Sequence, residues 1–186
     1  MLDLKNPKER NLFLAQQVNQ DSINKISQSI IEINEDDEEL YKIYKLHDLA
    51  YTPKPIKLYI DSYGGSVYQC FGLLGIMRTS KTPIHTIVTG CAMSCGFLIS
   101  IAGHKRFGYA KSTYLYHQVS SAAWGTVKDM EDDVIESKRL QKMIESHTLE
   151  LTKISKKKLD KVYKSKKDWF IDSDEALKLK IIDEIL

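Results

Sequence analysis

The feature that most constrains the fold is an alternation of short apolar segments with longer amphipathic ones. Compact runs such as residues 56–60 (IKLYI) and 84–89 (IHTIVT) have the composition of strands, and helical patterns follow them. An order of strand, helix, strand, helix, strand, helix is typical of layered α/β proteins whose strands pair in parallel. The predicted strands are residues 11–15, 56–60, 84–89 and 113–118, and the predicted helices are 21–33, 66–79, 95–102, 127–151, 156–165 and a short one after Asp172.

Two connecting segments are predicted to be irregular. Residues 35–54 are acidic and mixed, and they lead into residues 52–55 (TPKP), which have turn or linker chemistry. We therefore expect a surface excursion over residues 35–54. Residues 90–94 are small, and we expect them to form a turn between the strand at 84–89 and a buried helix at 95–102.

Length and charge limit the classes of function. A chain of 186 residues is the size of one ordinary domain, so we expect a single domain over residues 1–186. Hydrophobic residues make up 42% and charged residues 28%, as in globular proteins. The net charge of +2 gives no reason to expect nucleic acid or an anionic membrane as the main partner.

The cysteines and the apolar runs predict a cytoplasmic protein. Cys70, Cys91 and Cys95 cannot all pair internally, which fits a reducing compartment better than a disulfide framework. Residues 1–8 are too polar for the core of a signal peptide. The most apolar stretch, residues 91–102, is too short to span a bilayer.

Ser94 lies where a strand passes through small residues into a helix. A serine at that point can project its hydroxyl beyond the strand, and the first helical N–H groups would face an oxyanion formed beside it. The segment 90–96 (GCAMSCG) differs from G-x-S-x-G because Ala92 replaces the first glycine of that motif. Serine is also a common helix N-cap, so a purely structural role is the alternative.

Three further segments carry polar groups or glycines that catalysis could use. The pair Gly64 and Gly65 follows a strand and could present a backbone donor to an oxyanion, although a tight turn would also need glycine. His117 ends a predicted strand and could act as a general base, but a lone histidine is often structural. Asp168 precedes Trp169 and Phe170 and could orient that histidine, or could lie on the surface.

The joint occurrence of these segments, in this order, resembles the ClpP proteolytic subunits. The similarity extends from about Arg10 to the C-terminus. It is carried by residues 64–67, by 90–92 with Ser94 and Gly96, by His117 and Gln118, by Asp168 with Phe170, and by residues 175–176 and 182–183. This chain departs from the family at Tyr63, Cys95 and Val119, and in its longer 35–54 segment.

The resemblance implies a fold and a set of roles. The fold is the ClpP/crotonase α/β fold, with stacked β-sheet layers flanked by helices and a long handle helix in the region of residues 124–151. Ser94 is implied as nucleophile, His117 as base and Asp168 as orienting acid, without metal or organic cofactor. The N–H groups of Gly65 and Cys95 are implied as the oxyanion hole. The implied substrate groove comprises Gly64, Ser66, Gln118, Val119 and Ser120.

The resemblance also implies partners. It predicts self-assembly into heptameric rings stacked in pairs, a tetradecamer that encloses the sites and hydrolyses peptides or unfolded proteins. A Clp-type AAA+ ATPase is a candidate partner, although only about ten residues precede the first predicted strand, where family members use a longer N-terminus to meet the ATPase.

Other readings of the same residues stay open at this point. The alternatives are a phage-type prohead maturation protease, a catalytically silent ring subunit, and a crotonase-like acyl-CoA enzyme that uses both glycine turns for an enolate. A metal site built from Cys91, Cys95 and His85 is a weak pattern in an apolar segment.

Overall fold

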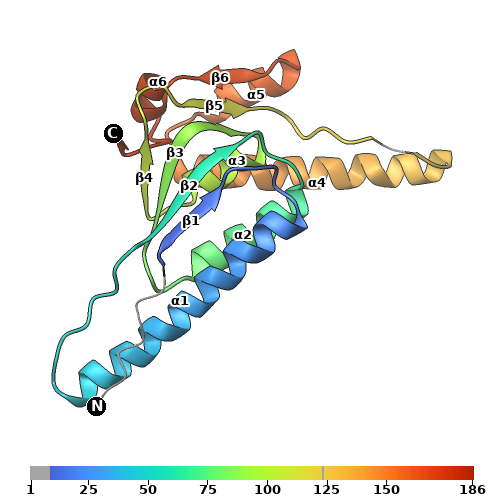
Figure 1. The fold of residues 1–186 in the computed structure, drawn as a ribbon. Coiled ribbons are helices and arrows are strands. Elements are labelled where there is room, and N and C mark those ends of the chain that lie inside the picture. Colours follow the sequence, from blue (N-terminus) through green and yellow to red (C-terminus); the bar gives the residue numbers. More distant parts are fainter. Residues whose placement is uncertain (1–8, 123) are drawn as a thin grey trace.

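The computed structural model describes residues 9–122 and 124–186, and it has α/β architecture with one branched sheet (Figure 1). The opening residues 1–8, on which the expectation about a signal peptide depends, lie outside the described residues. The strands are β1 (Asn11–Leu14), β2 (Ile56–Ser62), β3 (Ile84–Met93), β4 (Lys105–Gly108), β5 (Thr113–Tyr116), β6 (Trp169–Ile171) and β7 (Glu184–Ile185). The helices are α1 (Gln20–Leu46), α2 (Val67–Thr79), α3 (Cys95–Ile101), α4 (Val127–Leu151), α5 (Lys156–Ser165) and α6 (Ser173–Lys178).

The central strand β3 makes the sheet branch. Its first half pairs in parallel with β4, and its last residues pair in parallel with β5, while β2 runs along its other edge. The order β1-β2-β3-β4-β7 forms one path, and β5 with β6 forms the branch. The expected turn at residues 90–94 is therefore wrong, because residues 90–93 continue β3 and Cys91–Met93 pair with Thr113–Leu115. The Cys91 amide also donates to Asp61 Oδ1 at 2.9 Å.

Helix α1 is much longer than the sequence predicts. It is a 27-residue helix with Asn19 as its N-cap, and it runs through most of the segment that we expected to be a surface excursion. Its buried face follows helical spacing through Ile26, Ile30 and Ile33, and the next position on that face is Asp37. A charged residue on the inner face hides the helical period from a reading of apolar residues alone.

Asp37 can be buried because four hydrogen bonds from three side chains satisfy its carboxylate. Arg10 donates two hydrogen bonds to it, at 2.6 and 2.8 Å, Thr82 donates one at 2.5 Å, and the Tyr51 hydroxyl donates another. Burial raises the pKa of Asp37, but the hydrogen bonds from Arg10, Thr82 and Tyr51 outweigh burial and hold that pKa below its ordinary value. This cluster ties α1 to the sheet and to the segment before β2.

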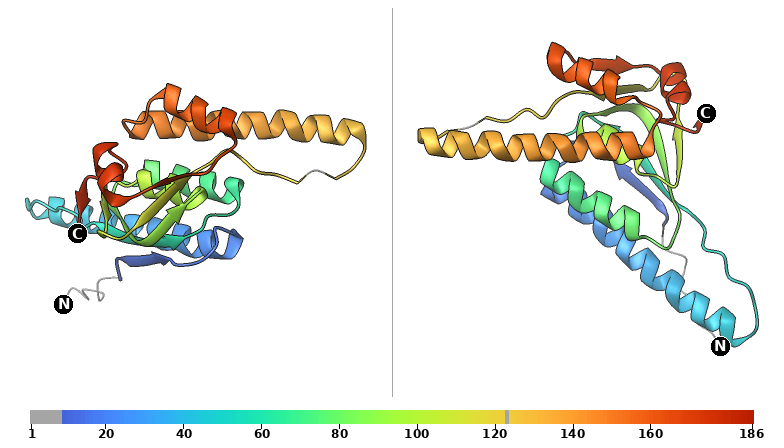
Figure 2. Two further views of the ribbon diagram at one scale, coloured as in Figure 1. Left: turned by 90° about the horizontal axis from the view of Figure 1, so that it is seen from above. Right: turned by 180° about the vertical axis from the view of Figure 1, so that it is seen from behind.

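The helices surround the sheet unevenly. Helices α1 and α2 lie side by side, and α3 packs on β2, β3 and β5 while it also contacts α2 and α4 (Figures 1 and 2). Every residue of α3 is buried, as its apolar composition predicts. Helix α4 has the predicted bounds, and its N-terminal half projects beyond the rest of the molecule (Figure 2).

The C-terminal segment completes the branch. The predicted basic helix is confirmed as α5, and Asp172 caps α6 by accepting from the Glu175 amide at 2.8 Å. Strands β4, β6 and β7, of four, three and two residues, were not predicted from the sequence. No helix in the described part of the chain is long and apolar enough to cross a membrane.

Candidate active site

Ser94 sits between the end of β3 and the start of α3 in an unusual backbone conformation. Its φ is 54° and its ψ is −120°, a combination that a non-glycine residue adopts only under restraint. The Ser94 amide donates to the Leu115 carbonyl at 3.0 Å, which holds this corner against β5. Its side chain makes no hydrogen bond to the helix amides, so Ser94 is not a conventional N-cap.

The Ser94 hydroxyl instead meets His117. Its Oγ lies 2.7 Å from His117 Nε2, within hydrogen-bond distance. The parallel register sets Met93 opposite Leu115, so the serine that follows β3 and the histidine that follows β5 emerge at the same sheet edge. This is the contact that a serine nucleophile and its general base require.

Asp168 lies beside the same histidine but does not hydrogen-bond to it. Strand β6 runs antiparallel to β5 with Trp169 opposite Tyr116, so Asp168 and His117 stand at the same end of this ladder. The distance from Asp168 Oδ1 to His117 Nδ1 is 4.0 Å, longer than a hydrogen bond. The Asp168 side chain is 57% exposed and the His117 side chain 26%.

The two glycines pack against the serine corner. A Cβ atom on Gly64 would lie 2.7 Å from Ser94 Cβ and 2.7 Å from the Met93 carbonyl oxygen, and Gly64 has a φ of +97°. A Cβ on Gly65 would lie 2.3 Å from the Val18 carbonyl oxygen. Only glycine therefore fits both positions without rearrangement.

Two backbone amides next to Ser94 are available to a ligand. The bridge to Val18 uses the Gly64 carbonyl and the Ser66 amide, each at 2.8 Å, and leaves out the Gly65 amide. The Cys95 amide is the first of α3, so it has no helical acceptor. Within residues 9–122 and 124–186, no oxygen accepts a hydrogen bond from either amide, although the Gly65 amide faces the Cys95 sulfur and, after the hydrogen bond from Cys70, contributes to lowering the pKa of that thiol.

A small cavity of about 40 Å³ opens beside Ser94. Gln118, Val119 and Ser120 line it together with Gly65 and His117. Two other predicted groove residues do not line this cavity: Gly64 is buried under Ser94, and Ser66 is the N-cap of α2, where its hydroxyl accepts from the Gln69 amide at 3.5 Å. Sequence reasoning missed four further lining residues, which are Val67, Leu98, Tyr116 and Ile144.

Gln141 on α4 is another residue that the sequence did not single out. Its Oε1 accepts a hydrogen bond from the Val119 amide at 2.9 Å, and its Nε2 donates to the Tyr116 hydroxyl at 3.5 Å. The side chain thus ties the strand beside the cavity to α4. The sequence does contain a signal for Gln141: it lies next to Leu140 and one turn before Ile144, so helical spacing places this polar residue beside the packed face of α4.

The weak metal pattern does not come together in space. In the part of the chain that the structure describes, no group of three or more histidine, cysteine or acidic side chains is placed to hold a metal ion. His85 packs its ring against Phe107 at 5.8 Å between centroids. Burial, with a contribution from Asp61, raises the pKa of the Cys91 thiol to about 11, which disfavours the thiolate that a metal needs.

Fold and site together define the class of protein: a strained serine and a histidine at one edge of a parallel sheet are the arrangement of a serine-type peptidase. The family model described as Clp protease matches residues 5–186. The chain therefore belongs to the Clp protease family and is a serine endopeptidase. This result favours a peptidase over the crotonase-like alternative.

Curated relatives agree with the family model. The chain is 32% identical over 148 residues to ATP-dependent Clp protease proteolytic subunit 2 of Treponema pallidum, covering 78% of this chain and 72% of that protein. It is 29% identical over 182 residues to subunit 2 of Synechococcus sp., covering 96% and 84%. A subunit 2 of Bacillus licheniformis is 28% identical over 183 residues, covering 96% and 87%.

Proposed function

We propose that this chain is the proteolytic subunit of a self-compartmentalised endopeptidase, with Ser94 as nucleophile, His117 as general base and Asp168 as orienting carboxylate. The single observation that carries the proposal is the 2.7 Å contact from Ser94 Oγ to His117 Nε2 at a restrained serine corner. Neither a helix cap nor an ordinary surface histidine needs that contact.

The proposed reaction is acyl transfer in two halves. His117 Nε2 takes the Ser94 proton as Oγ attacks the peptide carbonyl carbon, and the Gly65 and Cys95 amides stabilise the oxyanion. His117 then gives the proton to the leaving amine, the C–N bond breaks, and an acyl-enzyme remains on Ser94. Water, activated by His117, hydrolyses that ester and restores the serine. No step needs a metal or an organic cofactor.

Asp168 would have to move closer to His117 to act as a full triad member. Its present 4.0 Å separation from Nδ1 exceeds a hydrogen bond of about 2.8 Å by roughly 1 Å. Because Asp168 stands just before β6 and is half exposed, a small shift of its side chain toward His117 meets little packing resistance. We propose that this shift accompanies substrate binding or assembly.

The cavity supports a preference for small apolar side chains on the acyl side of the cleaved bond. Val67, Leu98 and Ile144 make its wall apolar, and its volume of about 40 Å³ is close to that of one or two water molecules. Peptides with alanine or valine at that position should be cleaved faster than matched peptides with tryptophan or aspartate. Ile144→Ala should widen the preference, and an unchanged ranking would contradict this assignment.

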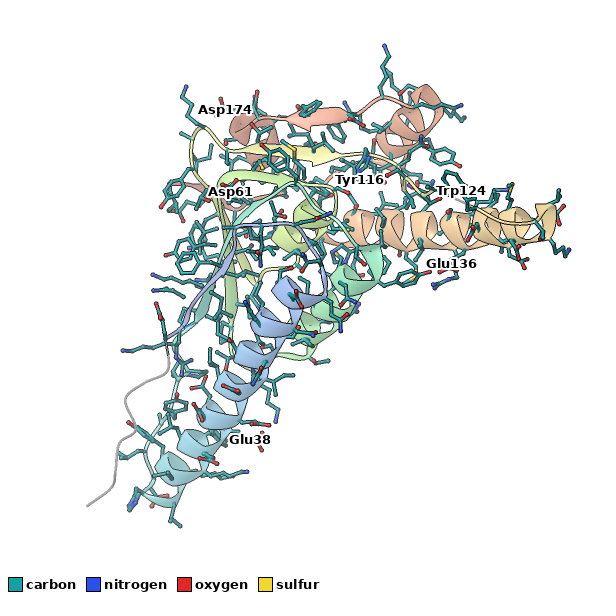
Figure 3. The ribbon with its side chains drawn as sticks, turned by 45° about the vertical axis from the view of Figure 1, so that its right-hand side comes forward. Glu38, Asp61, Tyr116, Trp124, Glu136 and Asp174 are labelled. Atoms are coloured by element: carbon teal, nitrogen blue, oxygen red, sulfur yellow. The ribbon has the colours of Figure 1, made fainter. Side chains whose placement is uncertain are left out.

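We further propose a cytoplasmic barrel of two stacked heptameric rings in which each chain contributes one domain, residues 1–186. The support is the exposed N-terminal half of α4 together with the segment just before it: Val127, the first residue of α4, is 75% exposed, and Trp124, three residues earlier, is 93% exposed (Figure 3). The three free cysteines suit a reducing compartment. The substrates would be peptides and unfolded proteins, and a Clp-type AAA+ ATPase is the proposed partner, as the names of the relatives suggest.

Labelling with a fluorophosphonate tests the catalytic assignment. The assembled protein should be labelled on Ser94, and labelling should disappear in Ser94→Ala and fall sharply in His117→Ala. Ser29→Ala, on a half-buried stretch of α1, is the matched control and should label normally. Persistent labelling of Ser94→Ala would overturn the assignment of Ser94 as the nucleophile. An assembled protein that is not labelled and does not cleave peptides would be a catalytically silent ring subunit.

Native mass measurement tests the assembly. A mass near fourteen chains supports stacked heptamers, and a stable monomer that cleaves peptides would contradict the barrel. Casein and a short peptide should then be compared with and without a Clp ATPase. Faster casein cleavage only with the ATPase supports a closed barrel with an ATPase partner, and equal cleavage without it argues against that partner.

A further inference from the structure

Two buried thiols lie directly behind the pair of amides that we assign to the oxyanion hole. Cys95 is the first residue of α3, and Cys70 is in the first turns of α2, which begins just after Gly65. Both side chains are at most 1% exposed, and neither is in a disulfide. The proposed catalytic reaction does not use either thiol.

Each thiol contacts the carbonyl oxygen of an assigned oxyanion residue, which lies in the peptide group that follows the assigned amide. The Cys95 thiol donates to the Gly65 carbonyl oxygen, with Sγ at 3.2 Å, and the Cys70 thiol donates to the Cys95 carbonyl oxygen, with Sγ at 3.6 Å. Gly65 has no side chain of its own to pack, and its φ of +150° is sparsely populated. The thiols therefore help to hold Gly65 and Cys95 in place from their carbonyl side.

The two sulfurs also interact with each other. A hydrogen bond between the thiols is the main reason that the pKa of Cys70 is raised and that of Cys95 is lowered; burial raises the Cys70 value further. Cys95 is thus the more acidic thiol and the better nucleophile. Cys91 differs, because its pKa of about 11 reflects burial and Asp61 rather than a second thiol.

We propose that Cys70 and Cys95 form a reversible disulfide that switches the peptidase off, an inference that rests on the proposed oxyanion role of Gly65 and Cys95. A peroxide is the oxidant. The Cys95 thiolate attacks one peroxide oxygen, the O–O bond breaks, and a sulfenic acid and one water result. The Cys70 sulfur then displaces hydroxide from that sulfenic acid, which forms the S–S bond and a second water.

The disulfide would disturb both oxyanion donors at once. An S–S bond of about 2.05 Å draws the sulfurs closer than a hydrogen bond allows, and both thiols lose their protons. The Gly65 and Cys95 carbonyls then lose their thiol donors, and the approach of the two sulfurs shifts the residues whose amides lie next to Ser94. Loss of a single oxyanion donor lowers kcat by about 100-fold to 1,000-fold. A dithiol reductant would restore both thiols and the activity.

The experiment treats the assembled protein with hydrogen peroxide and follows short-peptide cleavage, with and without later dithiothreitol. Intact mass and peptide mapping after alkylation report the bond. We expect loss of two hydrogen atoms, a Cys70–Cys95 cross-link, and an activity loss of about 100-fold that dithiothreitol reverses. Cys91→Ala is the matched control, which loses one thiol but should respond as the parent does.

Cys70→Ala removes the second thiol and with it the contact to the Cys95 carbonyl, so its activity after peroxide is compared with its own activity before treatment, and the two should be equal. Cys70→Ser serves the same purpose if the alanine variant does not fold. A cross-link without activity loss, no cross-link, or equal reversible inactivation of the Cys70 variants would overturn the switch.

The Ser94→Ala variant distinguishes a failure of the disulfide switch from a failure of the proposed peptidase function. The cross-link should form in this variant too, because it does not depend on turnover. If Ser94→Ala keeps its peptidase activity, the proposed function fails whether or not the thiols join. If the parent needs Ser94 but the thiols do not join, the switch alone fails.

Discussion

Ser94 holds a backbone conformation that needs support from its neighbours. Gly64 lies so close beneath it that a methyl group there would be 2.7 Å from Ser94 Cβ. The Leu115 carbonyl accepts from the Ser94 amide on the other side. The direction of the hydroxyl thus depends on a glycine and on a neighbouring strand, as well as on the local turn.

Replacing Gly64 tests this dependence. Gly64→Ala should lower peptide cleavage at least 100-fold and destabilise the fold by about 1–3 kcal/mol, because it adds both a clash and a strained φ of +97°. Thermal unfolding and peptide cleavage measure the two effects. Gly72→Ala is the matched control, since a methyl group there meets open space on α2 and should leave activity unchanged. Full activity in Gly64→Ala would contradict the close packing.

Asp168 gives a second prediction at this scale. Asp168→Asn should lower kcat by less than the roughly 10⁴-fold found when a well-ordered triad carboxylate is replaced, because Asp168 is half exposed and 4.0 Å from His117. The measurement is kcat on a short peptide, with KM expected to change little. Asp174→Asn, on the first turn of α6, is the control. A loss as large as that of His117→Ala would show a fully engaged triad.

The extension of α1 depends on one buried carboxylate. Asp37 continues the inner face of the helix one turn beyond Ile33, and Arg10 compensates its charge. Beyond Asp37, the end of α1 contacts the rest of the domain through the packing of Tyr44 on Tyr51 and through the exposed Glu38–Lys81 ion pair. An ion pair therefore determines how far this helix stays attached to the domain.

Removal of the Asp37 charge should destabilise the protein by about 3 kcal/mol at pH 7, the range for breaking a buried ion pair. The folded-state pKa of Asp37 is lowered, so its contribution is present above the unfolded pKa of about 3.9 and is lost as pH falls below that value. Denaturant unfolding measures this. As pH falls below about 4, the free energy of unfolding should decrease less in Asp37→Asn than in the parent, because the variant has no carboxylate to protonate.

Glu38→Gln is the control for this prediction. Glu38 makes exposed ion pairs with Lys42 and Lys81, at 3.3 Å each, so its replacement should change stability much less. Equal destabilisation by both substitutions would mean that burial of Asp37 is not the cause. An unchanged free energy of unfolding in Asp37→Asn would contradict the inference that the ion pair between Asp37 and Arg10 holds α1 on the domain.

At the scale of the whole molecule, α4 extends beyond the domain. Its buried residues are confined to its C-terminal half, where Leu140, Ile144 and Thr148 pack on the body. Its N-terminal half carries Val127, Met130 and Val134 at helical spacing, all exposed. Tyr68 on α2 reaches Glu136 with a hydrogen bond of 2.8 Å, near the point where α4 leaves the body (Figure 3).

If that exposed face joins two rings, a charge on it should separate them. Val134→Glu should reduce the native mass by about half while the far-ultraviolet circular dichroism stays unchanged, because an exposed position tolerates the residue within one chain. Glu131→Gln, on the same exposed helix, should leave the mass unchanged. A full-size assembly in Val134→Glu would place the ring contact elsewhere.

Much of the site could be predicted from sequence because it consists of local signals. The small residues before Ser94, the two glycines after β2 and the histidine after β5 stand next to recognisable strands. The cavity wall could not be predicted in the same way, because Leu98 and Ile144 come from different helices and look like ordinary core residues. Gln141 was missed for the same reason.

The sequence was sufficient to predict the alternation of strands and helices, the bounds of α4, and a strand before Ser94 with a helix after it, although β3 ends at Met93 and β5 ends before His117. These depend on side-chain periodicity and turn chemistry, which act over a few residues. Tertiary structure alone decided three other features: the branch of β3, the length of α1, and the place of Asp168 opposite His117. Each depends on pairing between segments far apart in the chain. Strand register and the compensation of a buried charge are set by those distant partners.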